Sequence, residues 1–73
     1  MTKVIYVSND FLCSEEGEVF NASEFGTRSS EEKLEWAEKQ DKFYVTLFDT
    51  LESFEWAFNN EEISDLGYIF FVE

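Results

Sequence analysis

The chain has 73 residues, of which 44% are hydrophobic and 19% aromatic, and its 17 acidic and five basic residues give a net charge of −12. A chain of this length forms one domain, here residues 1–73, and its apolar content excludes a disordered protein. The charge disfavours direct binding to nucleic acid or to an anionic membrane, and it favours a basic protein as partner.

The residue types that are missing exclude several kinds of chemistry. The chain has no histidine, a single cysteine (Cys13) and three scattered glycines. This composition excludes histidine-based catalysis, thiolate metal clusters and glycine-rich phosphate loops. Carboxylates are so frequent that their proximity alone does not indicate acid–base catalysis. We therefore expect a protein that is not an enzyme and that uses no cofactor and no metal ion.

Cys13 also bears on the cellular location. A lone cysteine cannot form an intramolecular disulfide, which fits a reducing compartment. Residues 4–7 are the only apolar run near the start, and they are too few for a signal peptide or a membrane span. We expect a cytoplasmic protein, in the host cytoplasm if the chain is phage-encoded.

The first part of the chain contains one clear strand and a long connection. Residues 4–7 are β-branched and aromatic and precede a polar run, which predicts a strand within 3–8. Residues 9–28 are mostly polar, and a connection this long without regular structure is unusual in a small domain. We therefore expect residues 18–21 to form a short strand that folds back on the first. The side chains expected to attach this connection to the core are Phe11, Phe20 and Phe25.

A capping box marks the start of the first helix. Ser29 is followed three residues later by Glu32, which predicts a helix near residues 30–41.

Three carboxylates lie on one line of this helix: Glu31, Glu35 and Glu38. Neighbours at these spacings have Cβ atoms about 5–6 Å apart. Phosphates advance by about 3.4 Å along the axis of a nucleic-acid strand while also winding around it, which is a comparable spacing. The line is either a ladder for recognition or an ordinary solvated helix face.

The second helix is predicted near residues 50–60. Asp49 or Thr50 is its N-cap, and Glu52 completes an Asp-x-x-Glu box. The residues that helical periodicity places in the core stripe are Leu51, Phe54, Ala57 and Phe58. Those on the outer face are Glu52, Glu55, Trp56 and Asn59. An exposed tryptophan is typical of an interface anchor, and the alternative is a ring that lies flat on a neighbouring element.

Two further apolar segments, 42–48 and 67–72, are typical of strands. Together the elements predict an α+β fold, a small two-layer domain with two helices packed on a three- to four-stranded sheet in the order β-(β)-α-β-α-β. The strand–helix–strand unit predicts a right-handed crossover between two parallel strands. Both segments are apolar on both faces, and two helices cover only one side of a sheet. The other side then meets residues 9–28, a partner, or a second copy in a homodimer.

In composition, the whole chain resembles two groups of small acidic proteins. One group comprises phage-encoded inhibitors that imitate nucleic acid, among them many anti-CRISPR and anti-restriction proteins. The other comprises acidic nuclease inhibitors and immunity proteins. The resemblance rests on size, aromatic content and charge across the chain, and not on a motif. It implies a nucleic-acid-binding or nucleic-acid-processing protein as the partner.

The leading hypothesis is therefore a small acidic inhibitor that imitates the charge of nucleic acid and occupies the basic cleft of such a protein. The residues expected to bind the partner are Glu31, Glu35, Glu38, Glu52, Glu55 and Trp56. The alternative is a non-catalytic structural or regulatory subunit, or an antitoxin-like partner, that binds through its aromatic sheet face while the charge serves solubility. Salt separates the two, because binding through charge weakens as the salt concentration rises and apolar docking does not.

Overall fold

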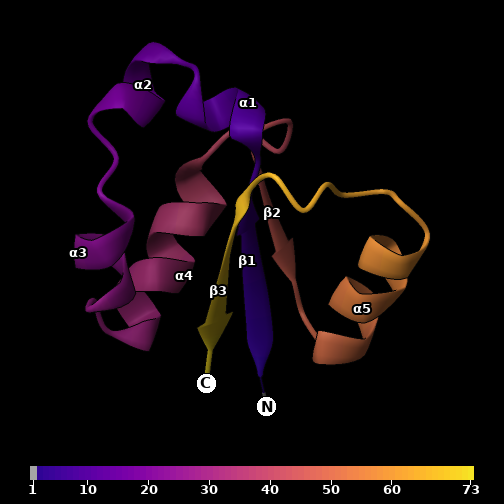
Figure 1. Ribbon diagram of the computed structural model, residues 1–73. Helices are drawn as coiled ribbons and strands as arrows, with labels where there is room; N and C mark the ends of the chain where they lie inside the picture. Colours follow the sequence, from indigo (N-terminus) through magenta and orange to yellow (C-terminus); the bar gives the residue numbers. More distant parts are fainter. Residues whose placement is uncertain (1) are drawn as a thin grey trace.

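The computed structural model describes residues 2–73, except for the side chain of Glu16. In chain order the described elements are β1 (Lys3–Val7), α1 (Asn9–Leu12), α2 (Glu15–Glu18), α3 (Ala22–Gly26), α4 (Ser30–Lys39), β2 (Val45–Phe48), α5 (Leu51–Asn59) and β3 (Tyr68–Val72) (Figure 1). The α+β class predicted from the sequence is confirmed. The two longer helices and the three strands all lie within or beside their predicted ranges.

β1 is the central strand of a three-stranded antiparallel sheet in the order β2-β1-β3. Ile5 of β1 is opposite Leu47 of β2 on one side and Phe70 of β3 on the other. β2 and β3 both run antiparallel to β1, so they point in the same direction, as the strand–helix–strand unit predicted. They are not neighbours, however, because β1 lies between them. The outer sides of β2 and β3 are therefore the two edges of the sheet.

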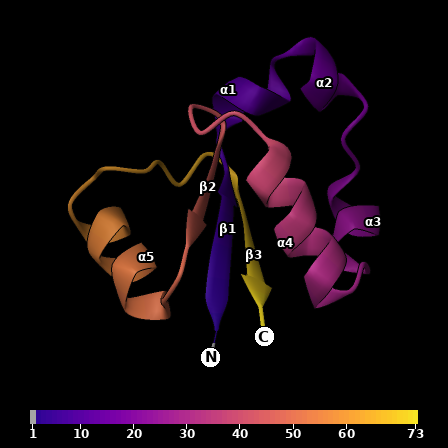
Figure 2. The same cartoon turned by 180° about the vertical axis from the view of Figure 1, so that it is seen from behind.

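The first face of the sheet, which we call the α4 face, carries the main core. Ile5 and Val7 of β1 are fully buried there and pack in one cluster with Ala37 of α4. Phe11 of α1 and Phe25 of α3 belong to the same cluster. Figures 1 and 2 show α1 to α4 on one side of the sheet and α5 on the other. The segment 9–28 thus shares a face with α4.

The opposite face, which we call the α5 face, is covered by a single helix. Val4 and Tyr6 of β1 are buried on this face, and α5 packs on β1 and β2. Phe54 of α5 lies between the outer strands, with its ring centroid 5.7 Å from that of Phe48 in β2 and 6.4 Å from that of Phe71 in β3. In place of both longer helices on one face, the structure has one on each.

Residues 9–28 form three short helices, and the prediction of a strand over 18–21 is wrong. Each helix follows a side chain that accepts a backbone N–H of its first turn: Ser8, Ser14 and Asn21. Ser14 Oγ accepts the Gly17 N–H at 3.2 Å, which draws residues 15–18 into a helical turn. Val19 then ends that helix, with 85% of its surface exposed. The prediction that three phenylalanines attach the segment to the core is confirmed for Phe11, Phe20 and Phe25.

α4 begins as predicted, and β2 begins later than predicted. Ser29 Oγ accepts the Glu32 N–H at 3.2 Å, as the predicted N-cap requires, and the Ser29 hydroxyl donates to Glu32 Oε1 at 3.3 Å. After α4, Asp41 makes a turn in which its carboxylate accepts the Phe43 N–H and its carbonyl accepts the Val45 N–H. This turn holds the residues before Val45 out of the sheet, so the strand starts there and not at residue 42.

The N-cap of α5 is Thr50, one of the two residues predicted. Its Oγ1 accepts the Ser53 N–H at 3.1 Å. The expected box between residue 49 and Glu52 does not form, because a helix capped by Thr50 places Glu52 at its second position and Ser53 at its third.

The C-terminal end of α5 closes with an unfavourable backbone conformation. The Glu61 N–H donates to the Phe58 carbonyl and the Glu62 N–H donates to the Ala57 carbonyl, the two bonds of a Schellman motif. In this motif Glu61 adopts a φ of 58°. That left-handed conformation favours glycine and costs a residue with a Cβ about 1–2 kcal/mol.

We predict that Glu61→Gly raises the free energy of unfolding by about 0.5–1 kcal/mol, because relief of the left-handed strain exceeds the added entropy of glycine in the unfolded chain. Thermal and chemical denaturation measure this change. Glu62→Gly removes the same charge one residue later, where φ is not positive, and should lower stability instead. Equal effects of the two substitutions would show that charge, and not backbone strain, decides the outcome.

A second prediction concerns the close approach of α2 to α1. A Cβ on Gly17 would overlap the Phe11 carbonyl oxygen and lie 2.7 Å from the Leu12 Cα, whereas a Cβ on Gly26 would meet nothing within 4 Å. Gly17→Ala should therefore lower the free energy of unfolding by more than about 2 kcal/mol, because backbone and not a flexible side chain must move. Gly26→Ala in α3 should be neutral or slightly stabilising. Denaturant titration of both variants tests the pair, and a stable Gly17→Ala protein would contradict the packing described.

Candidate partner-binding face on α5

Acidic and basic residues are distributed unevenly along the chain. Residues 28–42, which include α4, hold five acidic and four basic residues. Residues 43–73 hold seven acidic residues and no basic residue. The part of the molecule formed by β2, α5 and β3 therefore carries negative charge that no cation of its own sequence balances.

The carboxylate ladder predicted on α4 is present on its surface. Glu31, Glu35 and Glu38 are all exposed. Glu35 Oε1 accepts a hydrogen bond from Lys39 Nζ at 3.2 Å, and Lys33 also belongs to this helix. Exposed pairs of this kind contribute only about 0.3–0.5 kcal/mol. The two lysines nevertheless make the electrostatic potential around the ladder less negative than its three glutamates alone would make it.

α5 presents the other predicted site residues. Phe54 and Ala57 are buried against the sheet, which turns Glu52 and Glu55 outward into solvent. Trp56 is 57% exposed, as the helical periodicity predicted. A large aromatic ring thus stands among carboxylates on a helix without a basic residue.

Beside Trp56 the surface is hollowed. An open hollow of about 590 Å³ is lined by Phe48, Glu52, Ser53, Trp56, Ala57 and Glu62. Its lining combines the apolar side chains of Phe48 and the buried Ala57 with the carboxylates Glu52 and Glu62. Carboxylates attract a cation, and the face of an indole ring adds about 0.5–2 kcal/mol for one placed over it. The hollow therefore suits the side chain of a lysine or an arginine from another protein.

The structure does not bring the two acidic stripes together. α4 and α5 lie on opposite faces of the sheet, so their outer surfaces point away from each other (Figures 1 and 2). A flat basic surface can reach only one of them at a time. Of the predicted residues, Glu52, Glu55 and Trp56 share one surface, and the α4 ladder forms a separate one.

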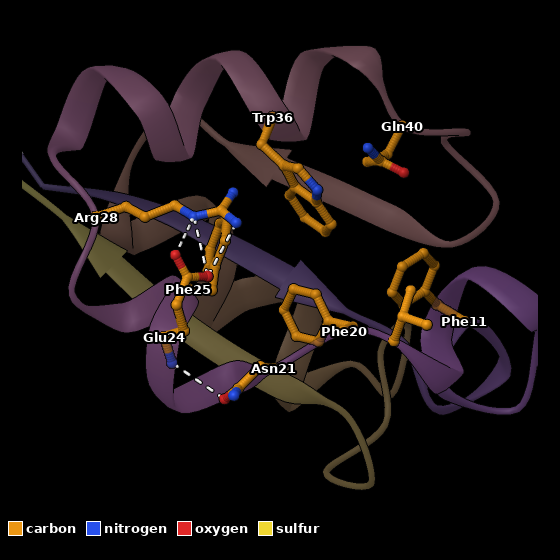
Figure 3. Close-up of a pocket in the computed structure, with 9 residues that line it drawn as sticks. Phe11, Phe20, Asn21, Glu24, Phe25, Arg28, Trp36 and Gln40 are labelled. Atoms are coloured by element: carbon orange, nitrogen blue, oxygen red, sulfur yellow. Dashed lines mark hydrogen bonds and ion pairs between the residues drawn. The ribbon is translucent and has the colours of Figure 1, made fainter.

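A second hollow lies between α3 and α4 and is of a different kind. It has a volume of about 230 Å³, below the roughly 300 Å³ of ordinary ligand pockets. Figure 3 shows Phe11, Phe20 and Trp36 pointing into it. The Phe20 and Trp36 rings are stacked, with centroids 5.3 Å apart, and attach the connection between α2 and α3 to α4. We interpret this hollow as a gap between packed side chains at the edge of the core, and not as a catalytic or ligand-binding site.

An ion pair closes one end of that hollow. Arg28 donates to Glu24 through both Nε and Nη2, with the Nη2–Oε2 distance at 2.9 Å (Figure 3). The guanidinium also lies over the Phe25 ring, 5.4 Å from its centroid. The hydrogen bond to Glu24 raises the pKa of the Arg28 guanidinium, and the charges of Glu24 and Glu32 act in the same direction. Arg28, which lies between α3 and α4, therefore attaches the chain that follows α3 to the side chains of α3 itself.

Other kinds of site receive no support within residues 2–73. No group of three or more acidic or cysteine side chains there is arranged to hold a metal ion. None of the described helices is long and apolar enough to cross a membrane. Comparison with protein-family models, with curated proteins and with solved structures finds no match to this chain.

Of the six residues that line the α5 hollow, the predicted site included only Glu52 and Trp56. It missed Ser53 and Ala57 of the helix itself, and Phe48 and Glu62 outside the helix. Phe48 belongs to the preceding strand and Glu62 to the turn after the helix, so helical periodicity cannot place them beside Trp56. The sequence does contain one signal for this surface, which is the absence of any lysine or arginine after Lys42.

The uncompensated charge gives a prediction about stability. Raising the ionic strength from about 0.05 M to about 0.5 M should raise the melting temperature by several degrees, because shortening the Debye length from more than 10 Å to a few Å screens the repulsion. Salt also weakens attractive ion pairs, but the described residues form only two of these, both accessible to solvent, so the loss is small. Calorimetry measures the shift. A Glu52→Gln/Glu55→Gln variant should melt higher at low salt and respond less, and a fall in melting temperature with salt would contradict the prediction.

Proposed function

We propose that the protein is a small non-catalytic inhibitor that imitates the charge of nucleic acid and occupies the basic cleft of a nucleic-acid-binding or nucleic-acid-processing protein. The observation that carries this proposal is the hollow on α5, which Trp56 lines together with the carboxylates Glu52 and Glu62. A lysine or arginine from the cleft enters this hollow, and its charge meets the carboxylates while its stem lies against the indole ring.

Charge spacing supports nucleic acid as the molecule that is imitated. Glu52 and Glu55 are three residues apart on a helix, a spacing that places Cβ atoms about 5–6 Å apart. Cationic side chains arranged to meet successive phosphates can meet carboxylates at a similar separation. The excess of negative charge also steers a basic partner toward this surface and speeds association.

Trp56 supplies the part of the affinity that charge does not. Exposed charge pairs contribute little because water and salt screen them. A tryptophan that becomes buried at the centre of an interface excludes water around the neighbouring pairs, and tryptophan is among the residues most often found at energetic hot spots.

The exposed single cysteine, Cys13, is in keeping with a reducing, cytoplasmic location for this activity. In this proposal the protein acts as the phage-type inhibitors that it resembles in composition do, by occupying the site of the nucleic acid.

A second candidate function follows from a separate observation. β3 exposes Ile69 and Phe71 on the α5 face of the sheet, and Phe71 is 56% accessible. A structural or regulatory subunit, or an antitoxin-like partner, could use this apolar surface while the charge serves solubility. Its binding would keep its strength as salt rises, in contrast to occupancy through charge.

The proposed function is tested by capture followed by competition. The immobilised protein is used to capture proteins from a host lysate, and a captured protein that binds nucleic acid is purified and loaded with labelled duplex or single strand. We expect the free protein to displace the label, with an affinity that falls as sodium chloride rises. Displacement that does not depend on salt, or a captured partner that binds no nucleic acid, would contradict the proposal.

Two variants with equal charge changes locate the surface. Glu52→Gln/Glu55→Gln should weaken displacement about tenfold, through slower association, and Trp56→Ala should weaken it by faster dissociation. Glu31→Gln/Glu38→Gln removes the same number of charges from α4 and should leave displacement near the wild-type value. Equal losses in the two double variants would mean that total charge, and not the α5 surface, is recognised.

A further inference from the structure

The outer edge of β3 has no partner among the described residues. β3 pairs with β1 on one side only and is the last strand of the sheet. The backbone hydrogen bonds that join different segments of residues 2–73 include none from β3 to an element beyond this edge. In a regular strand about half of the N–H and C=O groups point to each side, so this edge offers a row of donors and acceptors.

β3 also lacks the features that keep other edge strands from pairing. Natural edges are protected by lysine, proline, bulges or a covering element. Residues 68–72 read Tyr-Ile-Phe-Phe-Val, with no charged residue, no proline and no glycine. The strand is regularly paired with β1 along its whole length, without a bulge. Such a strand is ready to add another strand.

Beside this edge lies an apolar surface that α5 leaves uncovered. Phe58 of α5 and Ile69 and Phe71 of β3 are 41%, 36% and 56% exposed. Phe54 underneath joins them, with its ring 6.1 Å from Phe58 and 6.4 Å from Phe71. We call Phe58, Ile69 and Phe71 the β3 shelf. A strand added at the edge would place every second side chain over this shelf, because side chains alternate between the two faces.

The charge around the shelf determines which kind of strand fits. The hollow next to Phe58 is lined by Glu61, Glu62 and Asp65, and Glu73 follows the strand at its other end. With no basic residue from 43 to 73, these carboxylates repel a second copy of the same edge and attract lysine or arginine. Charge complementarity therefore selects a basic partner over a second copy of this chain.

We infer that the β3 edge and the β3 shelf form a strand-addition site for an extended basic segment of the target, with apolar residues facing the shelf and lysine or arginine facing the surrounding carboxylates. This inference rests on the proposed function, because it takes a basic protein as the target. It adds a backbone-mediated contact to the side-chain contact at the α5 hollow.

The inference is tested on the isolated protein by NMR titration and amide hydrogen exchange. The probe is a short peptide whose centre alternates valine with threonine and whose two ends carry lysine, so that valine faces the shelf while the lysines reach the carboxylates at the two ends of β3. Its two controls are a twin with glutamate in place of lysine and a twin of equal charge interrupted by proline, which cannot pair as a strand. We expect the lysine peptide to shift the amides of residues 68–72 and to slow their exchange. The proline twin should bind at least about tenfold more weakly, and the glutamate twin should not bind.

Variants test the shelf separately. Ile69→Thr/Phe71→Thr keeps the strand propensity while removing apolar surface, and it should weaken the lysine peptide about tenfold. Phe43→Thr changes an aromatic residue before β2 that is more exposed than Ile69 or Phe71, and it should have no effect. Thermal denaturation verifies that each variant folds.

Three results would overturn the inference. Equal binding of the lysine peptide and its proline twin, with shifts confined to residues 52–62, would leave the α5 hollow as the binding site and remove the edge. Protection of residues 68–72 in the absence of peptide, together with a dimer in sedimentation, would assign the edge to a second copy. Failure of all peptides to bind would remove the strand-addition site, while displacement of nucleic acid from the captured target would still decide the proposed function.

Discussion

Every layer of this small domain is attached to β1. Val4, Ile5 and Val7 have no exposed surface, and Tyr6 is almost fully buried, so four consecutive residues of a single strand are enclosed. β2 and β3 pair with the two edges of β1, α4 and the short helices cover one face, and α5 covers the other. Burying a Val or Ile side chain contributes about 1.5–3 kcal/mol, which is a large share of the 5–15 kcal/mol that stabilises an ordinary domain. The one polar group in this run, the Tyr6 hydroxyl, accepts the Ser64 N–H and so also holds the chain between α5 and β3.

Local signals predicted the parts of the fold that depend on local physics. Ser29, Thr50 and the apolar runs around Val45 and Phe70 mark elements that the structure contains, because capping and strand propensity act between residues close in sequence. The three short helices were not predicted, since helices of four or five residues show no periodicity and depend on single caps such as Ser14. The opposite placement of α4 and α5 follows from the sheet order, which is set by long-range pairing. The two-faced apolar strands indicated only that the second side of the sheet would meet residues 9–28, a partner or a second copy, and the structure places α5 there instead.

The candidate site, like the fold, was only partly predictable from the sequence. The outward position of Glu52, Glu55 and Trp56 follows from 3.6 residues per turn and needs no tertiary information. The hollow beside Trp56 needs Phe48 and Glu62, which only the folded chain brings to the helix. The sequence also could not predict that the glutamates of α4 and those of α5 lie on separate surfaces, because this depends on which face of the sheet each helix occupies. Helical periodicity thus predicted single exposed residues, and the topology decided which of them act together.

The two halves of the chain divide their aromatic and charged residues differently, and this division bears on whether the charge serves solubility alone. The rings of Phe11, Phe20, Phe25 and Trp36 contact one another within the core, and four of the five basic residues lie in the segment that includes α4. Residues 43–73 instead expose Trp56, Phe58 and Phe71, and all the charged residues in this range are acidic. A charge that served only to keep the protein in solution would be as effective on any surface. Here carboxylates line the hollows beside Trp56 and Phe58, an arrangement that repels copies of the chain and attracts a basic protein. The position of the charge, more than its amount, is therefore the feature on which the proposed recognition depends.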